Sequence, residues 1–268
     1  MKNLFKNSLY TLLCFAVAAC LSTKSSIEEA KSQASKGNFE EATKKLMAIA
    51  KIKPGSEESL DALRVGAKIS FLEAKDYQTA AVFFKELVLY SDQEKERIDA
   101  QKKLGEIYFE RLSDNARAID ELNKVLLIPI EPEEETKLRL MLAKAYFYLN
   151  KFGQAESEAD IILEKAKQPK SIFDAKLVKA NVAFSTQKFD RSAEIYEKLM
   201  SEFPQESREE HVGLTLAIVY EEQKELDEAI KVLEKIKTSY PNPEFIETKL
   251  QRILEKKKLL PGARGLRK

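Results

Sequence analysis

Few residues of this sequence have side chains that could do chemistry. The two cysteines, Cys14 and Cys20, lie within the first twenty residues, and the single histidine is His211. Without a cysteine after position 20, the rest of the chain can form no disulfide, thiolate metal site or thiol nucleophile. One histidine supplies at most one member of a metal site or a Ser–His pair, and no glycine-rich phosphate loop is present. The sequence therefore predicts no enzyme, metal or cofactor.

Cys20 follows a segment typical of a secretory signal peptide. Lys2 and Lys6 precede an apolar run over residues 9–19, and the small residues Ala18 and Ala19 stand directly before the cysteine. The run is about half of the ~20 residues that a membrane-spanning helix needs. We expect residues 1–19 to be removed and residues 20–24 to form a tether.

Two cleavage sites compete in this segment. Ala16-Val17-Ala18 fits ordinary signal peptidase, which would release a soluble secreted protein. Val17-Ala18-Ala19-Cys20 resembles the lipobox of bacterial lipoproteins, in which the cysteine becomes an acylated N-terminus. This resemblance implies lipidation of Cys20 and attachment to a membrane through the N-terminal lipid. Leu21 instead of Asp after the cysteine implies sorting to the periplasmic face of the outer membrane.

The charge of the chain argues against nucleic acid as a partner. Residues 20–254 carry 37 basic and 43 acidic side chains, whereas the last fourteen residues carry six basic and one acidic side chain. Affinity for nucleic acid comes mainly from neutralising phosphates, which an acidic body does poorly. We expect the basic segment 261–268 to be a disordered tail.

A repeat organises the remaining sequence. Segments such as KGNFEEAT, NKFGQAES and QKELDEAI each place a small residue shortly after a turn. A constant period between 20 and 50 residues predicts a solenoid, and the six small residues recur at intervals of 37 or 38: Ala42, Ala80, Ala118, Ala155, Ser192 and Ala229.

The unit around each turn resembles the tetratricopeptide repeat, a pair of antiparallel helices. Leu104-Gly105 with Tyr108 repeats the pattern of the family's first helix, and Leu216-Ala217 with Tyr220 does so again. The resemblance implies an all-α, right-handed α-solenoid of about six helix pairs over residues 25–243. A capping helix over residues 244–260 should cover the end of the stack.

The resemblance also implies a protein-binding groove lined by the first helix of each pair. Carrying the family's positions over, repeat by repeat, predicts nine groove residues: Ile69, Glu106, Phe109, Lys144, Phe147, Tyr148, Asn181, Phe184 and Ile218. Because the lysine and asparagine set that binds a terminal carboxylate in some family members is incomplete, we expect an apolar or helical segment of an envelope protein as the partner.

A signal segment followed by such repeats resembles two kinds of lipoprotein. One is the pilotins of type IV pilus secretins, and the other is the repeat lipoprotein of the outer-membrane β-barrel assembly machinery. The function that this implies is a lipid-anchored scaffold in a bacterial cell envelope. A soluble periplasmic coordinator of cell-wall or division machinery is the alternative, and an envelope enzyme has no supporting sequence feature.

Overall fold

The computed structural model describes residues 24–259. The predicted signal peptide, Cys20 and the tail over residues 261–268 lie outside the described residues. The chain forms two compact units, one ending at Ile128 and the other beginning at Pro129. Within the described residues both units are built from α-helices without strands, and unit 1 also contains two short π-helical turns.

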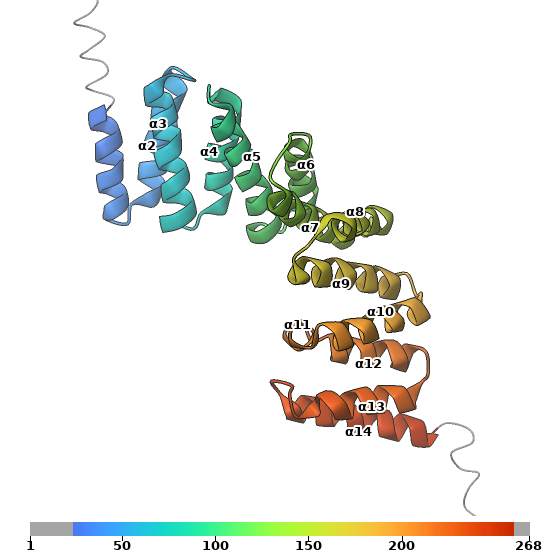
Figure 1. Ribbon diagram of the computed structural model, residues 1–268. Coiled ribbons are helices and arrows are strands. Elements are labelled where there is room, and N and C mark those ends of the chain that lie inside the picture. The colour runs from blue at the N-terminus through green and yellow to red at the C-terminus, as the bar shows by residue number, and fades with distance from the viewer. Residues whose placement is uncertain (1–23, 260–268) are drawn as a thin grey trace, which may run out of the picture. The chain divides into compact units, whose positions relative to one another are not determined.

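Unit 1 contains three helix pairs, visible as neighbouring antiparallel helices in Figure 1. The first pair is the helix over residues 24–35 with α2 (Phe39–Ile52). The second is α3 (Glu57–Lys68), extended by the π-helical turn η1 (Ile69–Glu73), with α4 (Tyr77–Tyr90). The third is α5 (Glu94–Glu106), extended by η2 (Ile107–Arg111), with α6 (Asn115–Leu126).

Unit 2 contains three further pairs and two additional helices (Figure 1). The pairs are α7 (Pro132–Tyr148) with α8 (Phe152–Lys165), α9 (Pro169–Ser185) with α10 (Phe189–Glu202), and α12 (Val212–Glu222) with α13 (Leu226–Lys237). The short α11 (Pro204–Glu209) connects α10 to α12, and α14 (Pro243–Leu259) packs on α13. The predicted all-α fold of packed antiparallel helix pairs is confirmed.

Small residues allow the two helices of each pair to approach closely. The small residue near the start of every second helix is fully buried, and a buried Ala or Gly of the first helix precedes it in each repeat. Twelve residues separate these two positions in four repeats, for example Ala143 and Ala155. At Gly105 an added Cβ would lie 2.7 Å from Leu122 Cδ2, which shows how closely these helices pack.

In every helix pair, the turn between the two helices contains one residue with a left-handed backbone conformation. It lies five positions before the buried small residue of the second helix, and the six are Gly37, Lys75, Ser113, Asn150, Gln187 and Lys224. The next N–H then donates back into the first helix, as Lys151 does to the carbonyl of Tyr146 at 2.9 Å. This arrangement satisfies carbonyl groups that a helix end otherwise leaves without partners.

Repeats 2 and 3 contain one extra residue, which the π-helical turns accommodate. Thirteen residues separate Ala67 from Ala80 and Gly105 from Ala118, instead of twelve. The N–H of Ala74 donates to the carbonyl of Ile69 at 2.9 Å, a π-type bond that widens the last turn of the helix. The insertion therefore changes which residues at the end of these first helices face the core.

Candidate protein-binding surface

The first helices of unit 2 carry a row of half-exposed side chains. We call this row the first-helix surface, and it includes six of the nine predicted groove residues. α7 and α9 are in direct contact, and α9 and α12 contribute to one hydrophobic core. The members of the surface are Leu140, Lys144, Phe147, Tyr148, Leu177, Asn181, Phe184, Leu214 and Ile218.

Phe147 and Phe184 occupy equivalent places and pack against the following helix. The Phe147 ring lies 5.7 Å from that of Phe152, and the Phe184 ring lies 5.9 Å from that of Phe189. Phe152 and Phe189 are the first residues of α8 and α10. Both predicted groove aromatics are thus partly buried, and they pack where the two helices of a pair are joined.

Tyr148 and Lys144 are the better placed groups for contact with another protein. The Tyr148 side chain is 60% exposed, and its ring meets Phe147 edge-on at 5.9 Å. Lys144 is half-exposed on the same helix and forms no ion pair within residues 24–259. A large exposed aromatic ring beside an unpaired cation is a combination common in protein interfaces.

Asn181 is held in position by a neighbouring tyrosine. The Tyr196 hydroxyl, on α10, donates a hydrogen bond of 2.5 Å to Asn181 Oδ1. Because Oδ1 is the acceptor of this amide, the two N–H groups of Asn181 stay available for a carbonyl of a bound segment. Burial raises the pKa of Tyr196, so the hydroxyl keeps its proton and remains a donor at ordinary pH. Ile218 extends the surface onto α12 as a half-exposed apolar side chain.

Unit 1 places two of the remaining predicted groove residues on α5 and η2. Glu106 is half-buried and accepts a 2.5 Å hydrogen bond from Lys103 Nζ, one turn earlier on the helix. Phe109 is partly buried and packs against the core that contains Tyr108 and Ala118. Neither of these two side chains is as exposed as Tyr148.

The prediction that Ile69 lines the groove is wrong. Ile69 is 3% exposed and belongs to the hydrophobic core of unit 1. The cause is the extra residue in repeat 2, which lies between the first helix and Ala80. A groove position counted back from Ala80 therefore falls one residue too far along the first helix. With Ala67 as the small residue, the position assigned to Ile69 belongs to Lys68, which is exposed.

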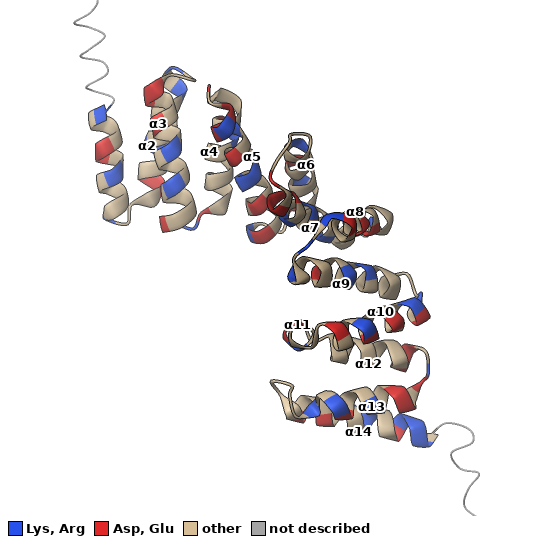
Figure 2. Ribbon diagram, viewed as in Figure 1, with Lys and Arg blue, Asp and Glu red and all other residues tan. Residues whose placement is uncertain are grey.

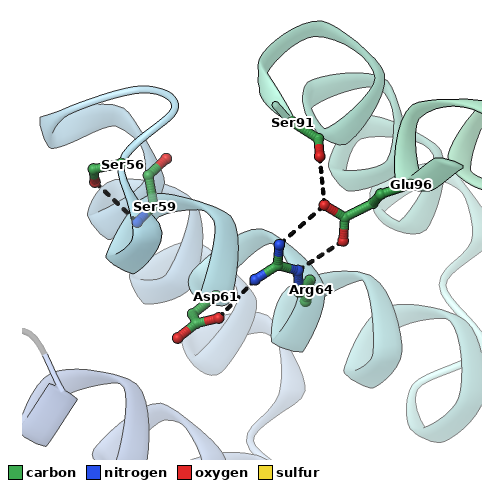
Figure 3. Close-up of polar contacts among 6 residues, drawn as sticks. All are labelled: Ser56, Ser59, Asp61, Arg64, Ser91 and Glu96. Carbon is green, nitrogen blue, oxygen red and sulfur yellow. Dashed lines mark hydrogen bonds and ion pairs between the residues drawn. The ribbon is translucent and has the colours of Figure 1, made fainter. Parts of the chain in front are cut away.

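Sequence reasoning missed a polar cluster between repeats 2 and 3 (Figure 3). Arg64 donates from Nε and Nη2 to the two carboxylate oxygens of Glu96, at 2.7 and 3.0 Å, and from Nη1 to Asp61 at 2.8 Å. The Ser91 hydroxyl donates to Glu96 at 2.6 Å. These hydrogen bonds, the one from Arg64 foremost, lower the pKa of Glu96. Arg64 and Glu96 lie thirty-two positions apart in the sequence, so no local sequence signal predicts such a pair.

Positively and negatively charged residues are interspersed along the helices (Figure 2). Many of them form ion pairs within a helix or between neighbouring helices, as Arg139 does with Glu135 of α7 at 2.7 Å and with Glu158 of α8 at 2.8 Å. Within residues 24–259 there is no group of three His, Cys, Asp or Glu side chains suited to hold a metal ion. Over the same residues, no helix is both long and apolar enough to span a bilayer.

Comparison with known proteins agrees with this architecture. Two family models described as tetratricopeptide repeat match residues 140–207 and 183–249. A crystal structure of a tetratricopeptide repeat protein from Parabacteroides merdae matches with 21% identity and a TM-score of 0.57, covering 89% of each chain.

A second solved structure is less similar, and no curated protein matches. Residues 1–338 of the assembly chaperone of RpL4, Acl4, align with 14% identity and a TM-score of 0.46, covering 88% of this chain and 98% of that one. Residues 140–249 thus match the tetratricopeptide repeat, and the other described residues share the same fold of paired antiparallel helices.

Proposed function

We propose that this protein is a lipid-anchored scaffold of a bacterial cell envelope that binds another envelope protein through the first-helix surface of unit 2. Tetratricopeptide repeats bind protein partners, and no enzyme family matches the chain. The observation that carries the proposed surface is Tyr148, because a large aromatic ring that is 60% exposed on a first helix adds little to folding. Aromatic anchors of this kind dominate many protein interfaces.

The surface favours a segment that combines an apolar face with hydrogen-bonding groups. Tyr148, Leu177 and Ile218 supply apolar area on three successive first helices. Asn181 supplies free N–H donors, and Lys144 supplies a positive charge. An amphipathic helix or an extended segment with one acidic residue near its apolar side chains would satisfy these groups together.

Lipid attachment is proposed at Cys20. The support is the sequence Val17-Ala18-Ala19-Cys20 at the end of an apolar run. Several acyl chains, at about 0.8 kcal/mol per buried methylene, hold a protein stably on a membrane where a single chain does not. Mass spectrometry of the mature protein should find an acylated N-terminus at Cys20. An unmodified N-terminus at Ala19 would instead support the soluble secreted alternative.

Affinity capture from detergent-solubilised membranes tests the binding surface. Replacing Tyr148 and Lys144 together by Ala should reduce recovery of the partner at least tenfold, which corresponds to about 1.4 kcal/mol. Tyr90→Ala is the matched control, because Tyr90 is an exposed tyrosine on the second helix α4. Equal recovery with the double variant and the control, both folded by circular dichroism, would reject the first-helix surface as the binding site.

A further inference from the structure

The helix α11 borders a cavity in unit 2. Its volume is about 320 Å³, and it lies among α10, α11, α12, α13 and the segment that follows α13. Met200, Leu214, Ile236 and Tyr240 form apolar walls. Ligand pockets have volumes of about 300–1,000 Å³, so this one has room for a large side chain and its adjoining backbone.

Two cations without partners line the same cavity. Arg208 and Lys235 both contribute to its wall, and the lining contains no Asp or Glu. Neither cation forms an ion pair or a side-chain hydrogen bond within residues 24–259, although most charged side chains of unit 2 are paired. A carboxylate brought by a ligand would therefore meet two positive charges without displacing an existing partner.

A buried hydroxyl in the wall also lacks a partner. Ser207 is 5% exposed, and its Oγ has no hydrogen bond within the described residues. Burying a hydroxyl without a hydrogen bond is unfavourable, and such groups are rare in folded proteins. A carbonyl oxygen placed in the cavity would accept the hydrogen bond that Ser207 does not make in the unliganded protein.

Strained backbone lies at the same place. His211 has a φ of 53° and connects α11 to α12, and its ring packs 4.9 Å from that of Tyr240. All other non-glycine residues with positive φ in the described chain belong to the turns within helix pairs. Backbone strain of this kind persists where the surroundings enforce it, and it is concentrated at binding sites.

We propose that this cavity is a second recognition site, which binds a segment of a partner protein with an apolar side chain next to a carboxylate. The apolar side chain enters between Met200, Leu214 and Ile236, and the carboxylate pairs with Arg208 and Lys235. A peptide carbonyl accepts from Ser207. This inference rests on the proposed role as a protein-binding scaffold, and it adds a site away from Tyr148.

Three small probes test the site on the intact protein by NMR titration. N-acetylphenylalanine offers the aromatic ring, a carboxylate and a peptide carbonyl, whereas N-acetylphenylalaninamide lacks the negative charge. The acid should bind at least threefold more tightly than the amide and shift signals of the cavity residues. 3-Phenylpropanoate lacks the acetamido group, so it should bind at least twofold more weakly than N-acetylphenylalanine.

Variants assign the preference to individual groups. Replacing Arg208 and Lys235 by Gln should abolish the preference for the acid over the amide. Replacing Lys167 and Lys188 by Gln should leave it unchanged, because these exposed lysines of unit 2 do not line the cavity. Ser207→Ala should weaken N-acetylphenylalanine binding at least twofold without lowering the melting temperature, since no hydrogen bond is lost within the folded chain.

Three outcomes would overturn the proposal. Equal affinity for the acid and the amide would show that Arg208 and Lys235 do not pair with the carboxylate. Signal shifts confined to α7 and α9 would place the probe on the first-helix surface. If 3-phenylpropanoate binds as tightly as N-acetylphenylalanine, the peptide carbonyl contributes nothing to binding. The cavity would then bind a free carboxylic acid and not a segment of a protein. The titrations need no partner protein, so a negative result there would reject the cavity site alone. The capture experiment with the Tyr148 variant tests the first-helix surface separately.

Discussion

Arg64 and Glu96 form a doubly hydrogen-bonded ion pair that joins the first helices of repeats 2 and 3, α3 and α5 (Figure 3). The pair is only partly exposed, and Ser91 donates a third hydrogen bond to the carboxylate. Planar guanidinium and carboxylate groups bonded in this way have a fixed relative geometry. The ion pair therefore helps to set the register between two repeats, in addition to the apolar contacts of the core.

This ion pair predicts a stability that depends on pH. The pKa of Glu96 lies below its ordinary value of 4.5 in the folded chain, so its contribution is present above about pH 4.5 and is lost as the pH falls through the lower, folded value. Glu96→Gln should lower the free energy of unfolding by about 1 kcal/mol at pH 7 and by less at pH 3. Urea unfolding at both pH values measures the difference.

A more exposed pair provides the control for that experiment. Glu28 accepts from Lys31 at 2.6 Å on the helix over residues 24–35, and both side chains are exposed. Glu28→Gln should change the free energy of unfolding by less than about 0.5 kcal/mol at either pH. A pH-independent loss in Glu96→Gln would mean that the variant disturbs packing and not the ion pair.

Close helix packing predicts opposite effects for two glycine substitutions. Gly105→Ala should destabilise the protein by about 1–3 kcal/mol, because the new Cβ would lie 2.7 Å from Leu122 Cδ2. Gly153→Ala should stabilise it by about 0.5–1 kcal/mol, because Gly153 lies in α8 with nothing within 4 Å of the new Cβ. Thermal melts of both variants provide the comparison, and a shift of the same sign in both would contradict the assigned packing.

The adjacent aromatics of α7 should separate stability from binding. Phe147→Ala should cost about 2 kcal/mol of stability, since its partly buried ring packs against Phe152. Tyr148→Ala should cost less than about 1 kcal/mol, since most of its side chain is exposed. Denaturant unfolding measures both. If Tyr148→Ala is the more destabilising change, Tyr148 supports the fold and is a poor candidate for a partner anchor.

The final helix should be an integral part of unit 2. Ile246 of α14 is fully buried in the same core as Leu233 of α13, so Ile246→Ala should cost about 2–4 kcal/mol. Thr248→Ala, an exposed change on the same helix, should have an effect below about 0.5 kcal/mol. Calorimetry distinguishes them, and equal melting temperatures would show that α14 contributes little to the unit.

Periodicity along the sequence predicts the pairs well because each small residue is dictated by a contact between two helices close in sequence. Ala42, Ala155 and Ala229 all lie at such contacts and are fully buried. The apolar residues of α14 do not all face the core: Ile246, Leu250 and Ile253 are buried, whereas Phe245 is 48% exposed.

Other features depend on information that a repeat alignment does not contain. The assignment of Ile69 to the groove fails because one extra residue inside a helix has no recognisable mark in the sequence. The hydrogen bond from the Ala74 N–H to the Ile69 carbonyl shows where the helix turn is wider. The six residues of α11 are too few to form a stable helix by themselves, and contacts with α10 and α12 stabilise it. The Arg64–Glu96 pair requires the packing of two repeats to be known.

The left-handed residues between paired helices have a consequence for the evolution of this chain. In L-amino acids with a side chain this backbone conformation costs roughly 1 kcal/mol, and glycine avoids most of that cost. Glycine occupies the turn only in repeat 1, while Lys75, Gln187 and Lys224 accept the strain. Interhelical packing holds these turns in the strained conformation. Replacing one of these residues by glycine should therefore raise the free energy of unfolding.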